Sequence, residues 1–275
     1  MSLMLKRLPV LLGWNRTSYA LLSGFLALLL LIGYVWRPLL EAYLATYNPA
    51  IPFWYQVDWL LLGIWVVMTL LIMANANIKT DWLITIVGFF GGLVIESWGT
   101  QTWLWSYYTY ERPPLWIIPA WPVASLSIDR LYRLLRRWTQ VLPESVFVIF
   151  YWLTFLSFYL IMWFFVLPTF DKSLTVMALL LCAFLILTPT DRRAMVLIFL
   201  AGSGLGYFLE RWGTTRQCWT YYTLETPPVF AVFAHGMAAV AFWRVAQLYS
   251  LFTPKILKLL QGFTVSRVNN RCNSL

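Results

Sequence analysis

Two glutamates, Glu96 and Glu210, lie within apolar segments and begin two copies of one motif. The stretch Glu96–Pro114 returns 114 residues later as Glu210–Pro228, and 11 of its 19 positions are identical. Carboxyl groups inside a bilayer are costly and usually functional, and burial favours their protonated form. We therefore regard Glu96 and Glu210 as candidate catalytic proton donors. The alternative is a structural hydrogen bond to a neighbouring helix or to an adjacent Trp or Tyr.

Aromatic residues accompany both glutamates in the same register. Those that we expect to line a substrate pocket are Trp98, Trp105, Tyr108, Trp212, Trp219 and Tyr222. An acid between aromatic faces suits chemistry through a carbocation, because the acid protonates a carbon–carbon double bond and the ring quadrupoles stabilise the cation. The same residues would also hold a flat polyene or a quinone without reacting, and the sequence leaves both interpretations open.

The second copy carries ionisable residues that the first copy lacks. Arg211 stands where the first copy has Ser97, and His235 stands where it has Trp121. We expect Arg211, as part of the binding site, to keep Glu210 ionised while Glu96 stays protonated, which would separate a base from an acid. His235 is a candidate catalytic proton carrier, although a lone histidine at a helix contact is more often structural.

Small and polar residues frame the two copies. Gly99 and Gly213 are expected to end or bend a helix near the surface. Asp58 is a further carboxylate, which we expect to pair with Lys172 or to face water. Glycines that align upstream of the motif, and that would let helices approach closely, are Gly88, Gly92, Gly202 and Gly206.

The rest of the chain must hold these groups inside a membrane. Its 275 residues are 61% hydrophobic and 11% charged, which excludes an ordinary soluble domain and a disordered chain. A membrane-spanning helix needs about 20 mainly apolar residues. Eight segments reach or approach that length: residues 18–36, 53–74, 81–104, 114–129, 145–167, 173–188, 194–212 and 228–250. The sequence therefore predicts an all-α polytopic membrane protein with about eight transmembrane helices.

Basic residues predict the orientation of these helices. With the N-terminus inside, 15 of the 20 Lys and Arg residues fall on the cytoplasmic side, so the positive-inside rule places both termini in the cytoplasm. Residues 1–138 and 139–275 then form two parallel four-helix repeats, related by a two-fold axis along the membrane normal. The cluster Arg130–Arg137 is expected to form the cytoplasmic linker between them. We expect the protein in a bacterial or archaeal cell membrane.

Several classes of site and partner are excluded by composition. One histidine and three cysteines at unrelated spacings provide neither a metal centre nor a disulfide framework. The net charge of +9 is explained by membrane topology rather than by a nucleic-acid partner. We predict no cofactor and no metal, and expect the partner to be a hydrophobic isoprenoid or lipid ligand.

The motif resembles a signature of carotenoid-biosynthesis membrane proteins. The resemblance rests on Glu96-x-x-Gly99-x-x-Thr102-x-x-Trp105-x-x-Tyr108-x-Tyr110, followed by Ile118-Pro119-Ala120-Trp121. It is to the bacterioruberin-type carotenoid hydratases and, more faintly, to the small integral-membrane lycopene cyclases. It implies proton addition to long polyenes without redox change, with Glu96 as the matching acid and Glu210 as its counterpart through the repeat.

Three functions therefore remain in view. The leading hypothesis is a membrane enzyme of the lyase or isomerase type, which protonates a double bond of an isoprenoid and causes hydration, cyclisation or isomerisation. The second is a non-catalytic pigment-, quinone- or lipid-binding subunit of a larger membrane-protein complex. The third is a small transporter, since parallel repeats and intramembrane carboxylates occur there too.

Overall fold

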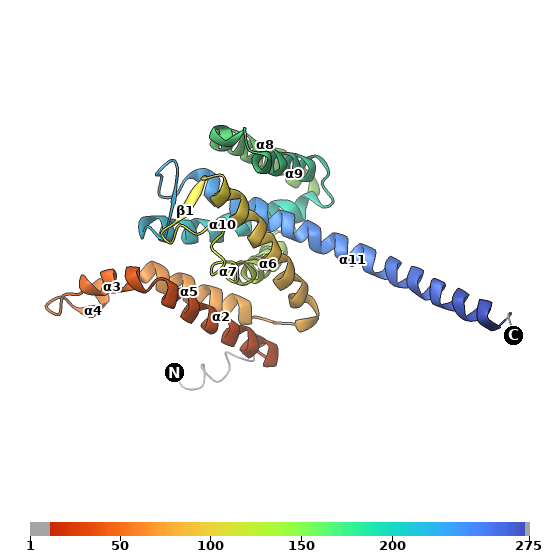
Figure 1. Cartoon of the computed structure of the whole chain (residues 1–275), viewed down its shortest axis with the longest axis horizontal. Helices are drawn as coiled ribbons and strands as arrows, with labels where there is room; N and C mark the ends of the chain where they lie inside the picture. The colour runs from red at the N-terminus through yellow and green to blue at the C-terminus, as the bar shows by residue number, and fades with distance from the viewer. Residues whose placement is uncertain (1–11, 273–275) are drawn as a thin grey trace.

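The computed structural model describes the backbone of residues 12–272 and the side chains of residues 12–252, and most of this chain is helical (Figure 1). The helices are α2 (Arg16–Val35), α3 (Arg37–Ala45), α4 (Phe53–Gln56), α5 (Trp59–Met73), α6 (Ile78–Gln101), α7 (Ala120–Trp138), α8 (Glu144–Val166), the 3-10 helix η1 (Leu167–Thr169), α9 (Ser173–Leu187), α10 (Arg192–Thr215) and α11 (Val229–Cys272). Some of the basic residues that we expect on the cytoplasmic side have side chains outside the described part: Lys6, Arg7, Lys255, Lys258, Arg267 and Arg271.

Five helical segments of the described chain are long and apolar enough to cross a membrane. They are α2, α6, α8 together with η1, α10, and residues Val229–Phe252 of α11. The protein is thus an all-α integral membrane protein, as the sequence predicts. Helices α5 and α9 are apolar but have only 15 residues each, and α7 carries several arginines.

Helix α7 differs from the expected fourth segment, residues 114–129. It begins later, at Ala120, because residues 115–119 form turns after Pro113 and Pro114. It also continues through the arginine cluster to Trp138, so Arg130–Arg137 is helical rather than a linker loop. Arg130 is buried in an ion pair with Asp81 of α6, 2.6 Å apart, which fixes the C-terminal half of α7 against the start of α6.

The internal repeat of the sequence is also present in the secondary structure. Helices α5 and α9, and helices α6 and α10, begin and end at positions 114 residues apart. Equivalent residues cap the second pair: Asn77 accepts a hydrogen bond from the backbone N–H of Lys79, and Asp191 from that of Ala194. A side-chain oxygen at this position satisfies one of the otherwise unpaired N–H groups of the first turn.

Two short strands that the sequence analysis did not anticipate connect the two copies of the motif. They are β1 (Trp105–Tyr107) and β2 (Trp219–Tyr221), which pair in antiparallel fashion. Ser106 lies opposite Thr220, its own counterpart in the repeat. A local two-fold axis therefore passes between these two residues, and equivalent side chains of the two strands point to the same face of the sheet.

Helix α10 lies at the centre of the fold. It packs against α11, α7 and α8, and 67% of its most apolar stretch is buried. Glycines permit this close packing: a Cβ added at Gly202 would lie 2.8 Å from the backbone oxygen of His235. Figure 1 shows that β1 and the start of α11 lie at one end of the bundle, while the C-terminal part of α11 extends from the other.

Candidate functional site

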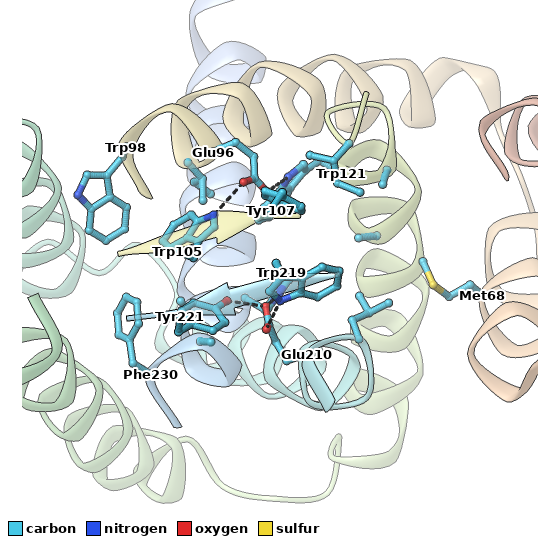
Figure 2. Close-up of a pocket in the computed structure, with 18 residues that line it drawn as sticks. Met68, Glu96, Trp98, Trp105, Tyr107, Trp121, Glu210, Trp219, Tyr221 and Phe230 are labelled. Atoms are coloured by element: carbon cyan, nitrogen blue, oxygen red, sulfur yellow. Dashed lines mark hydrogen bonds and ion pairs between the residues drawn. The ribbon is translucent and has the colours of Figure 1, made fainter. Parts of the chain in front are cut away.

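Glu96 and Glu210 face one cavity of about 150 Å³ beneath the β1–β2 sheet (Figure 2). Helices α5, α6, α7, α10 and α11 complete its walls, and the side chains between the aromatic ones are mainly Ile, Leu and Ala. The aromatic residues that line it are Trp98, Trp105, Tyr107, Trp121, Trp219, Tyr221 and Phe230. The site is thus an apolar, aromatic cavity that holds two carboxyl groups.

Three neutral donors surround the carboxyl group of Glu96. Trp105 donates its Nε1–H to Oε2 over 3.0 Å, and the hydroxyl of Tyr107 donates to Oε1 over 2.8 Å. Trp121 donates its Nε1–H to the same Oε1 over 3.2 Å. Glu96 is only 3% exposed, so these bonds replace the water that a carboxyl group would otherwise bind.

Glu210 has the same arrangement with one replacement. Trp219 donates its Nε1–H to Oε2 over 2.8 Å, and the hydroxyl of Tyr221 donates to Oε1 over 2.9 Å. The third partner is the imidazole of His235, whose Nε2 lies 2.9 Å from Oε1. His235 follows Pro228 by seven residues, or about 10 Å along α11 at ~1.5 Å per residue, which brings it level with Glu210.

Glycine makes the tryptophan–glutamate bonds sterically feasible. A Cβ on Gly99 would lie 1.9 Å from the ring of Trp105, and one on Gly213 would lie 2.0 Å from the ring of Trp219. Each indole ring therefore crosses its helix at the glycine, where there is no side chain. It thus reaches the glutamate that lies three residues before that glycine. We expected these glycines to end or bend their helices, but α6 and α10 each continue for two more residues.

The two clusters touch in the middle of the site. The rings of Trp121 and His235 stack with centroids 5.6 Å apart and an interplanar angle of 19°. On the sheet above, Trp105 contacts Tyr221 and Tyr107 contacts Trp219, with centroids 5.9 Å and 5.8 Å apart. Contacts between the halves thus hold the two carboxyl groups at fixed places around one cavity.

Comparison with protein-family models, curated proteins and solved structures found no match.

Six of the residues expected from the sequence line the cavity. They are Glu96, Glu210, His235, Trp98, Trp105 and Trp219. The two tyrosines that we expected, Tyr108 and Tyr222, lie outside it, and their hydroxyls donate to the backbone oxygens of Val35 and Phe165. The tyrosines of the cavity are the preceding residues, Tyr107 and Tyr221. Both copies of the motif contain both tyrosines, so recurrence does not indicate which of them faces the cavity. This depends on the alternation of side chains between the two faces of a strand.

Arg211 and Trp212 also lie outside the cavity. Arg211 donates to the backbone oxygen of Thr226 over 2.7 Å rather than pairing with Glu210, so our expectation that it keeps Glu210 ionised has no support in this geometry. Trp212 stacks on Trp36, with centroids 5.4 Å apart, and donates its Nε1–H to Asp58 over 3.0 Å. Its role is to join α10 to the end of α2 and the start of α5.

Asp58 connects the two halves near the sheet end of the bundle. It pairs with Arg216 over 2.9 Å rather than with Lys172, whose partner is Asp171. Burial by itself raises the pKa of Asp58, but the hydrogen bonds from Arg216, the backbone of Leu61 and Trp212 bring it below its ordinary value. Within the described part of the chain, no group of three or more His, Cys, Asp or Glu residues is placed to hold a metal ion.

Proposed function

We propose that this protein is a membrane enzyme that protonates a carbon–carbon double bond of an isoprenoid lipid. The observation that carries the proposal is the Glu210–His235 pair, which faces Glu96 within an aromatic cavity. A histidine bonded to a carboxylate is a common general acid or base, and aromatic faces stabilise a nearby cation. The resemblance of the Glu96 motif to carotenoid hydratases is in accord with this chemistry.

Glu210 and His235 share the proton that is transferred. That proton moves to one carbon of the double bond, the π electron pair forms the new C–H bond, and the other carbon becomes a carbocation. In isomerisation, the cation loses a proton from a neighbouring carbon. In hydration, it captures water and the resulting oxonium ion loses a proton. In cyclisation, a second double bond of the same chain attacks it and the new cation loses a proton. In each case the released proton returns to the Glu210–His235 pair.

Glu96 has a different role in this scheme. Its three partners are two tryptophans and a tyrosine, and both of its oxygens accept hydrogen bonds. We expected Glu96 to stay protonated, whereas donors of this kind suit an ionised carboxylate. We assign Glu96 to stabilising the carbocation, together with the faces of Trp105 and Trp219, because a fixed negative charge acts strongly in an apolar cavity.

The volume of the cavity limits which part of the substrate reacts. A cavity near 150 Å³ holds a molecule about the size of benzene. The reacting group is therefore a terminal portion of the isoprenoid, and the remaining chain extends between helices into the lipid. A substrate with its double bond at the end of the chain fits this arrangement better than one that reacts at its centre.

We also propose the finer topology that the repeat implies. Eight membrane helices, α2 with α5 to α7 and α8 with α9 to α11, would form two parallel four-helix repeats. The excess of basic residues that we assign to the end of the bundle opposite the sheet supports a cytoplasmic position for both termini. The cavity then lies near the outer leaflet.

The test is the isoprenoid profile of a pigment-producing host that expresses the protein. Glu210→Gln and Glu96→Gln should each abolish the difference that the wild-type protein makes. Glu41→Gln is the matched control, because Glu41 is exposed and pairs only with Arg37 on the surface of α3. Profiles that stay the same for both cavity variants and the wild-type protein would contradict the enzymatic proposal.

The second candidate is a non-catalytic binding subunit for a pigment, quinone or lipid. It is favoured by the same hydrogen bonds, since a carboxyl group whose oxygens are both occupied also serves as a rigid anchor for the surrounding rings. This function requires a stoichiometric small molecule, and a membrane-protein partner, to accompany the purified protein. Organic extraction and mass spectrometry of that protein would identify the ligand.

A further inference from the structure

We infer that the cavity between Glu96 and Glu210 is a binding site for an organic ammonium ion, such as the trimethylammonium group of a choline compound. This inference goes beyond the proposed enzymatic function, because it concerns a ligand that already carries its charge and requires no proton transfer. It stands on the balance of charge, the arrangement of rings and the size of the cavity.

The charge of the lining is the first observation. Two carboxyl groups, only 3% and 4% exposed, face the cavity, and its other ionisable residues in the described part of the chain are His235 and two tyrosines. Among the described residues, no Lys or Arg lines it. The nearby arginines bind elsewhere: Arg112 donates to the backbone oxygens of Thr100 and Gln101, and Arg211 to that of Thr226.

When both glutamates are ionised, this distribution leaves negative charge in the cavity for a ligand to balance. If His235 is protonated, it balances Glu210, and Glu96 remains without a cationic partner. Buried charges in proteins are normally paired, because an isolated one loses the solvation that water gives it. Neutral donors hold Glu96 in place, but they supply no positive charge. A cation in the cavity would complete the site.

The aromatic walls determine which kind of cation fits. Seven rings line the cavity, four of them indoles (Figure 2). Indole faces are the best cation–π partners among side chains, and cages of such rings are a recurrent way to bind quaternary ammonium groups. A metal ion or Na⁺ would need several free oxygen ligands, whereas all four carboxyl oxygens of this cavity already take part in hydrogen bonds with Trp, Tyr or His side chains. The lining therefore favours a cation covered by methyl groups.

Size and position agree with this ligand. A trimethylammonium group has four carbon and nitrogen atoms beyond its attachment point, which fits about 150 Å³ with little space left. Glu96 lies five residues before the end of α6, or about 8 Å at ~1.5 Å per residue. The cavity is therefore close to the depth where amine head groups of lipids meet the apolar part of a membrane.

Direct binding to the purified wild-type protein, in a maltoside detergent without ammonium groups, tests the inference. The probes are choline and its neutral isostere 3,3-dimethylbutan-1-ol, and the quenching of tryptophan fluorescence measures their binding. We expect saturable binding of choline that is at least tenfold tighter than that of the isostere. Equal affinity for the two compounds, or no saturable binding of choline and of hexyltrimethylammonium, would overturn the inference.

The hexyltrimethylammonium arm identifies the source of the ligand. Tighter binding of this tailed cation than of choline assigns the site to the head group of an amphiphile, and equal binding assigns it to a soluble amine. Both results support an ammonium site. If the wild-type protein binds choline but makes no difference to the isoprenoid profile of the host, only the enzymatic proposal is contradicted.

A pair of variants locates the binding. Glu96→Gln should weaken choline binding at least tenfold, whereas Glu41→Gln should leave it unchanged. Both proteins are first compared with the wild type by thermal unfolding and by size-exclusion chromatography. If Glu96→Gln does not fold, Phe230→Leu replaces it, since this change removes one ring from the wall and keeps both carboxyl groups. Unchanged choline binding in a folded cavity variant would place the cation elsewhere and overturn the inference.

Discussion

The carboxyl clusters of the two halves share one plan and differ in one partner. In each cluster, a glutamate accepts hydrogen bonds from a tryptophan and a tyrosine of the neighbouring strand, and a glycine leaves space for the indole ring. The remaining partner is Trp121 in the first cluster and His235 in the second. The shared parts build the cavity, and the single difference places a titratable group on one side of it.

The halves also differ where α6 and α10 begin. Arg130 of α7 donates to the backbone oxygen of Ala74 and pairs with the buried Asp81. Its counterpart in the repeat, Arg244 of α11, donates to Thr188, and Met195 stands where the first half has Asp81. Arg244 thus keeps the hydrogen bond but lacks the ionic partner. The same fold is held by an ion pair in one half and by apolar packing in the other.

The largest expected effect comes from making the two clusters alike. His235→Trp gives Glu210 the indole partner that Glu96 already has, so the hydrogen bond and the ring stack are kept while the proton carrier is removed. Loss of a general acid lowers a rate by about 10²–10⁴-fold. The measurement is product formation from isoprenoid lipids in isolated membranes. A variant that folds and keeps the wild-type rate would show that the difference between the clusters is not catalytic.

The next effect separates the two buried arginines. Arg130→Met should lower the free energy of unfolding by about 3–5 kcal/mol, because it leaves Asp81 as a buried and unpaired charge. Arg244→Met should cost about 1–3 kcal/mol, because it leaves only backbone and hydroxyl acceptors unsatisfied. Thermal and denaturant unfolding in detergent measure both. Arg130→Met combined with Asp81→Leu is the control and should recover most of the loss; equal costs for the two single variants would contradict the comparison.

A smaller effect tests what the halves share. Gly99→Ala and Gly213→Ala should each lower the free energy of unfolding by about 1–3 kcal/mol, because the added methyl group would overlap an indole ring. Gly204→Ala in α10 is the matched control. It has open space around it and should be neutral, or stabilising by up to about 1 kcal/mol through helix propensity. Clearly unequal costs for Gly99 and Gly213 would show that the clusters are less alike than their contacts suggest.

The smallest expected effect concerns the ion pair between the halves. Asp58 precedes α5, outside the helices that cross the membrane, and Arg216 is half exposed (50%), so the pair should contribute roughly 0.5 kcal/mol. The pKa of Asp58 is lowered in the folded protein, so this contribution is complete above the unfolded pKa of about 3.9 and declines as the pH falls below it. Asp58→Asn should lower the unfolding temperature slightly at pH 7 and reduce its fall toward pH 3. An unchanged pH dependence would contradict this assignment.

Some parts of the site followed from the sequence because they depend on local patterns. Helix periodicity and hydropathy predict α6 and α10, and the repeat of Glu96 at Glu210 indicates that both matter. The position of His235 relative to Glu210 follows from the rise of a helix. Two of the assignments that failed depend on a strand. We chose Tyr108 and Tyr222 because they recur in both copies, but Tyr107 and Tyr221 recur as well, and the alternation of β1 and β2 directs these two into the cavity.

The sequence by itself determined that this is an all-α membrane protein with a duplicated acidic and aromatic motif, because hydrophobicity, helix length and repetition are properties of the chain. Only the tertiary structure decided how the copies meet. Pairing of β1 with β2, close helix approach at glycines, and the stack of Trp121 on His235 are long-range contacts. The strand pairing and the ring stack join segments more than 100 residues apart, and Gly202 meets His235 33 residues further along the chain. These contacts turn two separate motifs into one cavity.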